Sequence, residues 1–446
     1  MKSIHFIGIG GAGMCPLAEI LHHDGYKISG SDNNESETLS RVKALGIPVA
    51  MGQRAENIAG AEMIVYTAAL LPDNPELLAA KASGIPTYER AKLLGSVTRR
   101  YNNCLCVCGT HGKTTTTAML TQILLTAQLS PTAVIGGRLP LTNSNGLVGE
   151  SETMVCEACE FQDTFLQLDP NVAIILNVDE DHMEYFKTLE NLIASFRRFA
   201  SMSKTVIYNG DDPNTLRALE GLKGKKLISF GRSEENMFRA ANVTLRHAFA
   251  TFDLLYQGEF LTKIYLRLPG EHNVMNALAA IAAAMLSGAS ILDCEYAFAA
   301  FQGAGRRFEV LGTYRGITIA DDYAHHPKEL SVALTTAKQM PYQRVWAVFQ
   351  PFTFSRTAML MDDFAKALRI ADRVVLTKIM GAREINTYGV STADLAAKVP
   401  GSVWFDEFDE TADYIVEHAR SGDLVLTMGC GDIYKAAKLM IKKLKS

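Results

Sequence analysis

The stretch that decides the fold is Cys104–Thr114, which reads CLCVCGTHGKT. Its first half is apolar and predicts a strand, and a glycine-containing turn and a helical stretch over Thr115–Thr126 follow. A strand, a glycine loop, Gly-Lys-Thr and a helix form the layout of a phosphate-binding loop, in which backbone N–H groups surround the phosphates, the lysine reaches the β- and γ-phosphate oxygens and the hydroxyl holds Mg²⁺. The full motif has another glycine where this chain has Val107. The loop is therefore a shortened variant, and an ordinary strand–turn–helix junction remains an alternative.

A second glycine loop lies close to the N-terminus. Ile4–Ile7 predicts a strand, Gly8–Gly13 satisfies G-x-G-x-x-G, and Met14–His23 predicts the helix that follows. The next predicted strand, Tyr26–Gly30, ends near Asp32. Such glycines let the backbone approach a pyrophosphate, and the acid can bond a ribose hydroxyl. A turn without ligand and the NAD site of an oxidoreductase are the alternatives. The phosphate loop before Lys113 argues against the NAD interpretation, because a dehydrogenase needs only one nucleotide.

Composition excludes several classes of protein. The 446 residues suggest roughly three domains, and a net charge of -4 gives no basic excess for nucleic acid. No apolar stretch reaches the roughly 20 residues of a membrane span, and the N-terminus lacks the pattern of a signal peptide. We therefore expect a cytoplasmic protein, a monomer or weak homodimer, without nucleic-acid partner or membrane insertion.

The eight cysteines do not form the pattern of a disulfide scaffold in a chain of this length. Cys104, Cys106 and Cys108 alternate, so that on a strand they share one face. We interpret them as small packing residues. A metal or redox site is the alternative.

Alternation of strands and helices predicts an α/β fold with three domains. Residues 1–100 form a Rossmann-like domain, residues 101–305 a central P-loop domain, and residues 306–446 a C-terminal Rossmann-like α/β domain. Within the central domain, the segment from Asn242 to Leu268 resembles a meander and predicts an added antiparallel sheet. In the last domain a single helix is predicted over Thr357–Ile370.

Polar residues follow several predicted strands, at the edge where open α/β sheets bind ligands. Glu160 follows one strand and His182 follows the next. Both could face phosphates and hold Mg²⁺, which proteins usually bind through one or two groups in addition to phosphate oxygens. Solvated, capped loops are the alternative interpretation.

Two further polar loops occur in the last domain. Asp321–Pro327 carries two acids and two histidines, although it could also serve as a helix N-cap. Arg356 follows another strand and could bind a substrate carboxylate in a bidentate pair. A surface ion pair is the alternative for this arginine.

Together these motifs resemble the Mur ligases of bacterial cell-wall synthesis, over nearly the whole chain. The matching segments are His5–Met14, Gly109–Thr116, Glu157–Glu160, Asn177 with Asp181–Met183, Gly270–Ala277, Arg307–Glu309 and Asp322–Pro327. The resemblance is to the members that add L-alanine to UDP-N-acetylmuramate. It implies that the first domain binds the UDP sugar, that the central domain binds ATP, and that the third binds the amino acid and closes over ATP.

The resemblance also implies the chemistry and the residues that perform it. The lactyl carboxylate would attack the γ-phosphate of ATP, with Mg²⁺ as second cofactor, and the amine of L-alanine would attack the acyl phosphate. Catalytic residues would be Lys113, Glu160, His182, His325 and Arg356. The metal ligands would be Thr114, Glu160 and His182. The ATP site would comprise Gly109, Thr110, His111, Gly112, Lys113, Thr114, Thr115, His272, Asn273, Asn276, Arg307 and Asp322. The UDP-sugar site would comprise Gly8, Gly10, Gly11, Ala12, Gly13, Met14, Asp32 and His111. The amino-acid site would comprise Tyr323, His325 and Arg356.

Two departures from the family pattern qualify this prediction. Many Mur ligases carry a carbamylated lysine after the metal-binding histidine, where this chain reads Ser195-Phe196-Arg197-Arg198. The loop that often reads Gln-Pro-His is Gln350-Pro351-Phe352 here. The alternatives are a recycling ligase that attaches a tripeptide to the same UDP sugar, an NAD-dependent oxidoreductase, and a non-catalytic nucleotide-binding module.

Overall fold

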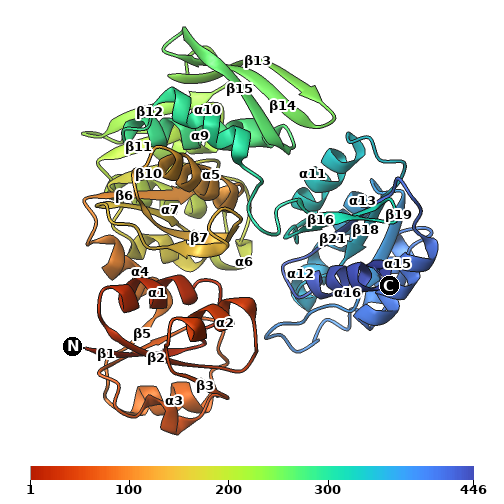
Figure 1. The fold of residues 1–446 in the computed structure, drawn as a ribbon, viewed down its shortest axis with the longest axis horizontal. Coiled ribbons are helices and arrows are strands. Elements are labelled where there is room, and N and C mark those ends of the chain that lie inside the picture. Colours follow the sequence, from red (N-terminus) through yellow and green to blue (C-terminus); the bar gives the residue numbers. More distant parts are fainter. Residues whose placement is uncertain (1, 446) are drawn as a thin grey trace. The chain divides into compact units, whose positions relative to one another are not determined.

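The computed structural model describes residues 2–445, which fold into two compact units (Figure 1). The first unit comprises the chain up to Thr244, Thr251–Arg267 and His272–Gln302, and it contains two sheets. The second comprises Leu245–Ala250, Leu268–Glu271 and the chain from Gly303 onward, and it contains one sheet. The predicted α/β class with three sheet-based parts is confirmed, whereas the predicted domain boundaries remain predictions.

The N-terminal sheet has five parallel strands in the order β3-β2-β1-β4-β5. Its strands are β1 (Ser3–Ile7), β2 (Lys27–Asp32), β3 (Val49–Met51), β4 (Met63–Tyr66) and β5 (Thr87–Glu89). Its helices are α1 (Cys15–His23), α2 (Glu37–Ala44), η1 (Ala55–Ile58), α3 (Pro75–Ala82) and α4 (Arg90–Thr98). The chain reverses its direction of winding between β1 and β4, which places the Gly8 loop at the crevice where such sheets bind ligands.

The central sheet has ten strands in the order β15-β14-β13-β12-β11-β10-β6-β9-β7-β8. They are β6 (Asn103–Cys108), β7 (Thr132–Leu139), β8 (Ser144–Leu147), β9 (Thr153–Glu157), β10 (Val172–Ile175), β11 (Thr205–Asn209), β12 (Lys226–Gly231), β13 (Phe238–Arg246), β14 (Phe249–Tyr256) and β15 (Glu259–Pro269). The helices of this part are α5 (Lys113–Thr126), η2 (Phe161–Gln167), α6 (Met183–Phe186), α7 (Leu189–Met202), α8 (Pro213–Leu219), α9 (His272–Leu286) and α10 (Ile291–Ala300). The predicted meander is confirmed as β13–β15, whose two-residue connections require antiparallel neighbours. These strands continue the parallel sheet and do not form a sheet of their own.

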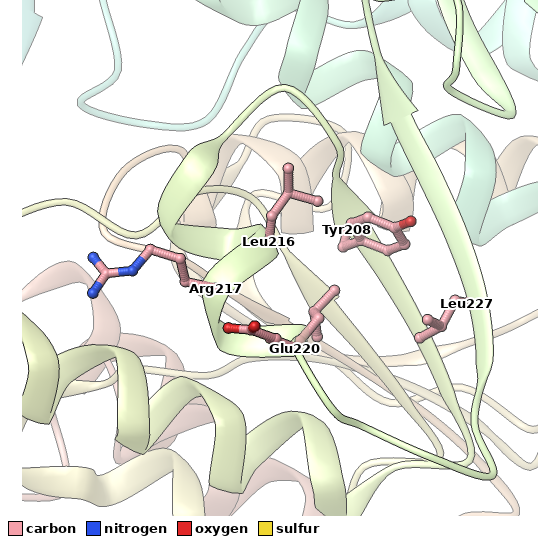
Figure 2. A pocket seen from close by; sticks show the side chains of 6 residues that line it. Tyr208, Leu216, Arg217, Glu220 and Leu227 are labelled. Atoms are coloured by element: carbon pink, nitrogen blue, oxygen red, sulfur yellow. The ribbon is translucent and has the colours of Figure 1, made fainter.

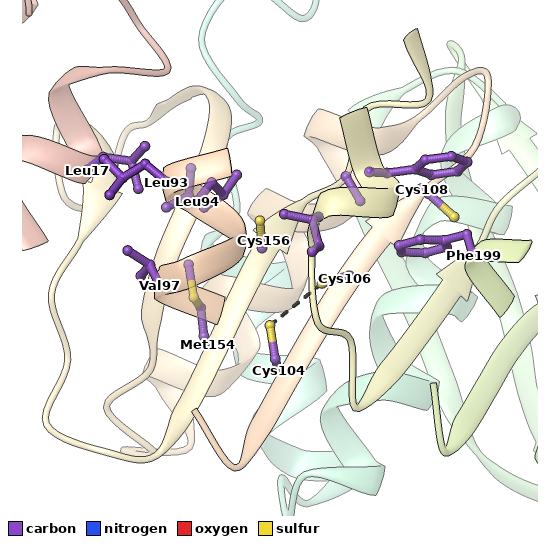
Figure 3. Close-up of a cluster of buried hydrophobic side chains, with 14 of the residues drawn as sticks. Leu17, Leu93, Leu94, Val97, Cys104, Cys106, Cys108, Met154, Cys156 and Phe199 are labelled. Atoms are coloured by element: carbon purple, nitrogen blue, oxygen red, sulfur yellow. Dashed lines mark hydrogen bonds between the residues drawn. The ribbon is translucent and has the colours of Figure 1, made fainter. Parts of the chain in front are cut away.

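The alternating cysteines pack inside the central part (Figure 3). Cys104, Cys106 and Cys108 are fully buried on β6, and Cys156 lies beside Cys106 on the neighbouring strand β9. The sulfur atoms of Cys104 and Cys106 are 3.6 Å apart, and all eight cysteines are free thiols. The interpretation of these residues as packing residues is confirmed.

The second unit is built on a six-stranded sheet in the order β16-β17-β21-β18-β19-β20, parallel except for β16. Its strands are β16 (Glu309–Tyr314), β17 (Ile317–Asp322), β18 (Val345–Phe349), β19 (Arg373–Thr377), β20 (Val403–Phe405) and β21 (Leu424–Met428). Its helices are α11 (Pro327–Lys338), α12 (Phe354–Met359), α13 (Met361–Leu368), α14 (Thr392–Lys398), α15 (Phe408–His418) and α16 (Tyr434–Lys445). Separate apolar clusters cover the two faces, one with α11 and α13 and one with α15 and α16.

The single helix predicted over Thr357–Ile370 is wrong, because two short helices, α12 and α13, occupy this region. Leu360 leaves the helical conformation with φ -113° and ψ 22° and caps both helices. Asp362 and Asp363 then lie in the first turn of α13, where acids stabilise a helix N-terminus.

None of the described helices combines the length and the apolar character that crossing a membrane requires.

Candidate active site

The phosphate loop connects β6 to α5 and is held by Asn177, which follows β10. The backbone N–H of Thr110 donates to the Asn177 carbonyl at 3.1 Å, and the N–H of His111 donates to its side-chain oxygen at 2.8 Å. The Asn177 amide returns a hydrogen bond to the His111 carbonyl at 3.0 Å. Because three hydrogen bonds fix the first half of the loop, the N-terminus of α5 has a defined direction, as an anion-binding helix N-terminus requires.

The loop needs glycine at two positions for reasons that the structure makes visible. Gly109 and Gly112 have φ values of +139° and +87°. A Cβ at Gly109 would lie 2.9 Å from the Leu176 Cβ, and one at Gly112 would lie 2.3 Å from the Asn276 side-chain oxygen. The close approach brings Asn276, on α9, against the phosphate loop. Its amide donates to Asn273 at 3.0 Å, so two of the residues predicted for the ATP site lie together.

Lys113 begins α5 and lies in a ring of acceptors. Its ammonium donates to the carbonyls of Gly109 and Thr110 at 2.7 and 3.1 Å, and to the carboxylate of Glu160 at 3.0 Å. Glu160 is 1% exposed. Burial, the largest single effect, would lower the pKa of Lys113, but the neighbouring acidic groups, Glu160 foremost and then Cys159 and Glu157, together outweigh it and hold the pKa above its usual value. Lys113 is therefore charged at neutral pH.

Glu157, which the sequence analysis did not select, lies beside the predicted metal-binding hydroxyl. Thr114 Oγ1 donates to one carboxylate oxygen of Glu157 at 3.1 Å, and the Gly136 N–H donates to the other at 2.8 Å. Its place in the sequence could have revealed it. Glu157 is the last residue of β9, and Glu160, which was selected, follows the same strand. Glu160 contacts Lys113, and its predicted role as a metal ligand remains a prediction.

The donors fit a hard divalent cation that is shared with a ligand. A hydroxyl and a carboxylate stand side by side at Thr114 and Glu157, and oxygen donors suit Mg²⁺. Among residues 2–445 no group of three or more His, Cys, Asp or Glu side chains forms a complete metal cage. Mg²⁺ at this place would therefore complete its shell with phosphate oxygens and water.

His182 stands on the other side of the phosphate loop. Strands β9 and β10 flank β6, so Glu160 and His182 follow the two strands next to the loop. His182 has a φ of 55° and precedes α6, and its ring lies 4.6 Å from the ring of Phe161 between centroids. The sheet order therefore brings the predicted pair to one edge.

The N-terminal glycine loop lines a separate pocket of the first unit. Gly8, Gly10 and Gly11 line it together with Asp32. The Asp32 carboxylate accepts the N–H of Gly10 at 2.9 Å and that of Asn34 at 3.0 Å, so it shapes this loop in addition to any ribose contact. Met14 is 1% exposed and packs in the core.

Three amide side chains of this pocket were missed by the sequence analysis. Gln53 Oε1 accepts hydrogen bonds from the amides of Asn33 at 3.0 Å and Asn74 at 2.6 Å, and all three residues line the pocket. They follow strands β2, β3 and β4 along the chain, at the edge where such sheets bind ligands. In addition, the amide of Asn145 on β8 contacts the carbonyl of Ala12, which ties the central part to the glycine loop.

In the second unit, Asp322 shapes the loop that the sequence analysis selected. Its carboxylate accepts the N–H of Phe308 and of Ala324, each at 2.7 Å, and burial raises its pKa to about 6. The guanidinium of Arg307 lies 4.9 Å from the ring of Tyr323. Arg306, which was not predicted, bonds Asp321 at 2.8 Å and helps to fix the same loop.

The predicted amino-acid site lies at the same edge of this sheet. His325 Nδ1 lies 3.3 Å from Glu329 and 3.0 Å from the Tyr323 carbonyl. Burial lowers the pKa of His325. Arg356 lies in α12 and is half-buried, and within residues 2–445 its guanidinium has no hydrogen-bond or ion-pair partner. The surface ion pair that was the alternative for Arg356 is therefore not formed.

One further pocket lies apart from these residues. Figure 2 shows Tyr208, Leu216, Arg217, Glu220 and Leu227 around a hollow between α8 and the strands β11 and β12. None of the predicted site residues lines it.

The comparisons with known proteins cover the chain from end to end. Three family models match: "Mur ligase family, catalytic domain" over residues 3–102, "Mur ligase middle domain" over 107–284 and "Mur ligase, glutamate ligase domain" over 306–431. The UDP-N-acetylmuramate–L-alanine ligase of Caldanaerobacter subterraneus is 41% identical over 100% of this chain and 98% of its own. That of Agathobacter rectalis is 43% identical over 99% of this chain and 98% of its own.

Solved structures agree in fold. The crystal structure of a UDP-N-acetylmuramate–alanine ligase from Thermotoga maritima aligns with a TM-score of 0.86 at 27% identity, over 100% of this chain and 99% of that one. A murein peptide ligase from Psychrobacter arcticus aligns with a TM-score of 0.79 at 22% identity, over 100% and 99%, which shows the fold alone. With full-length relatives above 40% identity and three matching family models, this chain belongs to the Mur ligase family.

Proposed function

We propose that this protein is an ATP-dependent ligase that joins the lactyl carboxylate of UDP-N-acetylmuramate to the amine of L-alanine, in the synthesis of peptidoglycan precursors. The observation that carries the proposal is the phosphate loop at the end of β6, where the Lys113–Glu160 and Thr114–Glu157 pairs stand next to each other. The full-length alanine ligases that are 41% and 43% identical to this chain support the choice of substrates. Because ATP and nucleotide sugars are intracellular metabolites, we place the reaction in the cytoplasm.

The reaction consists of two substitutions. A carboxylate oxygen of UDP-N-acetylmuramate attacks the γ-phosphorus of ATP, and the bond to the ADP oxygen breaks. The amine of L-alanine then attacks the carbonyl carbon of the acyl phosphate, phosphate leaves, and the amine loses a proton as the amide forms. Positioning and charge stabilisation account for most of the catalysis in phosphoryl transfer.

The chain's own residues supply these two contributions. Lys113, which is charged, would neutralise oxygens of the transferred phosphoryl group, and the N-terminus of α5 would hold the neighbouring phosphates. Thr114 and Glu157 would hold Mg²⁺. His182 would face the phosphates from the segment after β10, on the opposite side of the loop from Glu157. When bound, Mg²⁺ supplies a further positive charge at the β- and γ-phosphate oxygens.

The N-terminal pocket suits a UDP sugar. Its glycine loop permits a pyrophosphate to approach, and the amides of Asn33, Gln53 and Asn74 can both donate to and accept from a base or a ribose. An NAD-dependent oxidoreductase would use this pocket alone. The phosphate loop at Lys113 would then have no ligand.

Arg356 is our candidate for recognition of the amino-acid carboxylate, because it offers a half-buried guanidinium that has no hydrogen-bond or ion-pair partner among residues 2–445. A guanidinium binds a carboxylate through two parallel hydrogen bonds. The recycling ligase, which would accept a tripeptide at this place, is the second candidate function, and the alanine ligases among the close relatives argue for the single amino acid.

The proposal is tested by phosphate release from ATP in the presence of UDP-N-acetylmuramate and one acceptor at a time. The acceptors are L-alanine, glycine, L-serine and the tripeptide, and mass spectrometry identifies each product. We expect release to depend on both substrates and to be fastest with L-alanine. Faster turnover of the tripeptide would favour the recycling ligase, and NADH-dependent turnover would favour the oxidoreductase.

Removal of the Lys113 charge should abolish most of the activity. For Lys113→Ala we expect a loss of about 3–4 kcal/mol of transition-state stabilisation, a few hundredfold in rate. Steady-state kinetics measure the change, with Lys204→Ala, at an exposed position, as the control. Activity within about threefold of wild type would contradict the assignment of this loop to ATP.

Substitution in the glycine loop should separate the two nucleotides. A Cβ at Gly10 would lie 2.9 Å from the Leu39 Cβ and 3.0 Å from the Asp32 carboxylate, so Gly10→Val must displace the loop. Calorimetric titration should show the UDP sugar weakened much more than ATP. If ATP is weakened instead, the assignment of the two loops is reversed.

A pair of variants decides which acid holds the metal. Glu157→Gln should raise the Mg²⁺ concentration needed for half-maximal activity by about tenfold or more, because even outer partners of metal ligands contribute about 10- to 100-fold. Glu160→Gln, its matched control, should mainly reduce the rate constant through Lys113. The reverse pattern would restore Glu160 as the principal ligand.

Removal of the Arg356 guanidinium should affect one substrate only. Arg356→Ala should raise the KM for L-alanine at least about tenfold, the scale of one lost charge-assisted hydrogen bond, and leave the KM for ATP nearly unchanged. Arg356→Lys should be intermediate, and Arg373→Ala, at an exposed arginine, should have no effect. An unchanged KM for L-alanine would show that the amino-acid site lies elsewhere, with the loop around His325 as the next candidate.

A further inference from the structure

One carboxylate, which the proposed mechanism does not use, joins the two loops that flank the phosphate loop. Asp163 lies in η2, three residues after Glu160, and its Oδ2 accepts a hydrogen bond from the hydroxyl of Tyr185 at 2.9 Å. Tyr185 lies in α6, the short helix that begins directly after His182. The other oxygen, Oδ1, accepts a hydrogen bond from the hydroxyl of Ser195 on α7. Asp163 therefore connects the segment after β9 with two helices that follow β10.

A second contact runs parallel to the first. The ring of Phe161 lies 4.6 Å from the ring of His182 at an angle of 41°, and 6.5 Å from the ring of Tyr185 in an edge-on arrangement. We call the side chains of Phe161, Asp163, Tyr185 and Ser195 the loop brace. The loop brace therefore has a hydrogen-bonded part at Asp163 and an aromatic part at Phe161, and both lead to the segment that carries His182.

The loop brace rests on a rigid support. Ser195 is 4% exposed and lies on the buried face of α7. Phe165, also in η2, stacks on Phe199 of the same helix with centroids 4.6 Å apart and planes 5° apart, and it meets Phe196 edge-on at 5.4 Å. Because α7 packs in the core, it holds η2 and Asp163 in place.

The backbone at both ends of the loop brace is in the left-handed region. Gln162, Asp163 and His182 have φ values of 54°, 58° and 55°. Residues other than glycine keep such conformations only where the surrounding structure determines them strongly, and they concentrate at functional sites. The contacts at Asp163 and Phe161 supply such constraints.

The position of the loop brace gives it a role in the reaction. Since β9 and β10 flank β6, phosphates bound at Lys113 as in the proposed function would lie between the segment with Glu160 and the segment with His182. The separation of these two segments therefore decides how well a metal–nucleotide complex fits. Partners behind metal ligands orient those ligands and tune metal affinity.

We propose that Asp163 is a positioning residue which, through the loop brace, fixes His182 relative to Glu160 and so sets the affinity of the phosphate loop for a divalent cation bound to a nucleoside triphosphate. The identity of the ligand, ATP with Mg²⁺, rests on the proposed function. The inference concerns affinity and geometry, and it assigns Asp163 no direct contact with substrate.

The test measures binding without turnover. Mn²⁺ replaces Mg²⁺, a non-hydrolysable ATP analogue replaces ATP, and electron paramagnetic resonance reports the bound Mn²⁺ in the full-length protein. Asp163→Asn removes one hydroxyl acceptor, and Tyr185→Phe removes only the hydroxyl of a side chain that is 40% exposed, so this variant should fold. Both should weaken Mn²⁺ binding about tenfold, and Asp163→Glu should recover part of the affinity. Asp169→Asn, an exposed acid shortly after η2, is the matched control.

Four outcomes separate the explanations. Weaker Mn²⁺ binding with unchanged UDP-sugar affinity and unchanged melting temperature supports the positioning role. Unchanged Mn²⁺ affinity in both variants overturns it, and so does an equal loss of UDP-sugar affinity and thermal stability, which indicates a purely structural role. If the wild type binds Mn²⁺ and the analogue but releases no phosphate with L-alanine, the proposed function fails while the test of Asp163 still holds.

Discussion

The site depends on one constraint, which is the fixation of the phosphate loop by Asn177. A loop that binds phosphate must present backbone N–H groups in a set direction, and a flexible loop would lose affinity to the entropy of ordering. The Asn177 carbonyl and side chain bond Thr110 and His111 on the first half of the loop. The second half then enters α5 with the helix N-terminus already oriented. Lys113, Thr114 and their acidic partners take their positions from this start of the helix.

Charge is distributed around the loop so that each cation already has a counter-charge. Glu160 balances Lys113, and Glu157 accepts a hydrogen bond from Thr114 and from the backbone of β7. A buried carboxylate without such partners would be costly, whereas here Glu160 is paired with Lys113 and Glu157 accepts two hydrogen bonds. Bound phosphates would change the partner of Lys113, and the carboxylates would then be available to a cation. The electrostatic design therefore favours a polyanion together with a divalent metal.

Much of this could be predicted from the sequence, because glycine loops and strand-end acids are local signals. The fold class, the phosphate loop, the meander and the packing role of the cysteines followed from periodicity and from motifs. Contacts between distant segments carry no such signal. Glu157 was overlooked because its partner Thr114 is on another strand-helix junction, and the amides of Gln53 and Asn74 are ordinary loop residues until the sheet brings them together. The break between α12 and α13 at Leu360 was not predicted, because the apolar periodicity of the sequence continues across it.

The central claim is that the site at Lys113 transfers the γ-phosphoryl group to a carboxylate before the amide forms. The most direct measurement uses UDP-N-acetylmuramate labelled with ¹⁸O in the lactyl carboxylate, with ATP and L-alanine, and mass spectrometry of the released phosphate. An acyl-phosphate route predicts that each phosphate carries one labelled oxygen from the carboxylate. Phosphate free of label, formed together with the amide, would contradict the account, because the carboxylate oxygen would then never have been bonded to phosphorus.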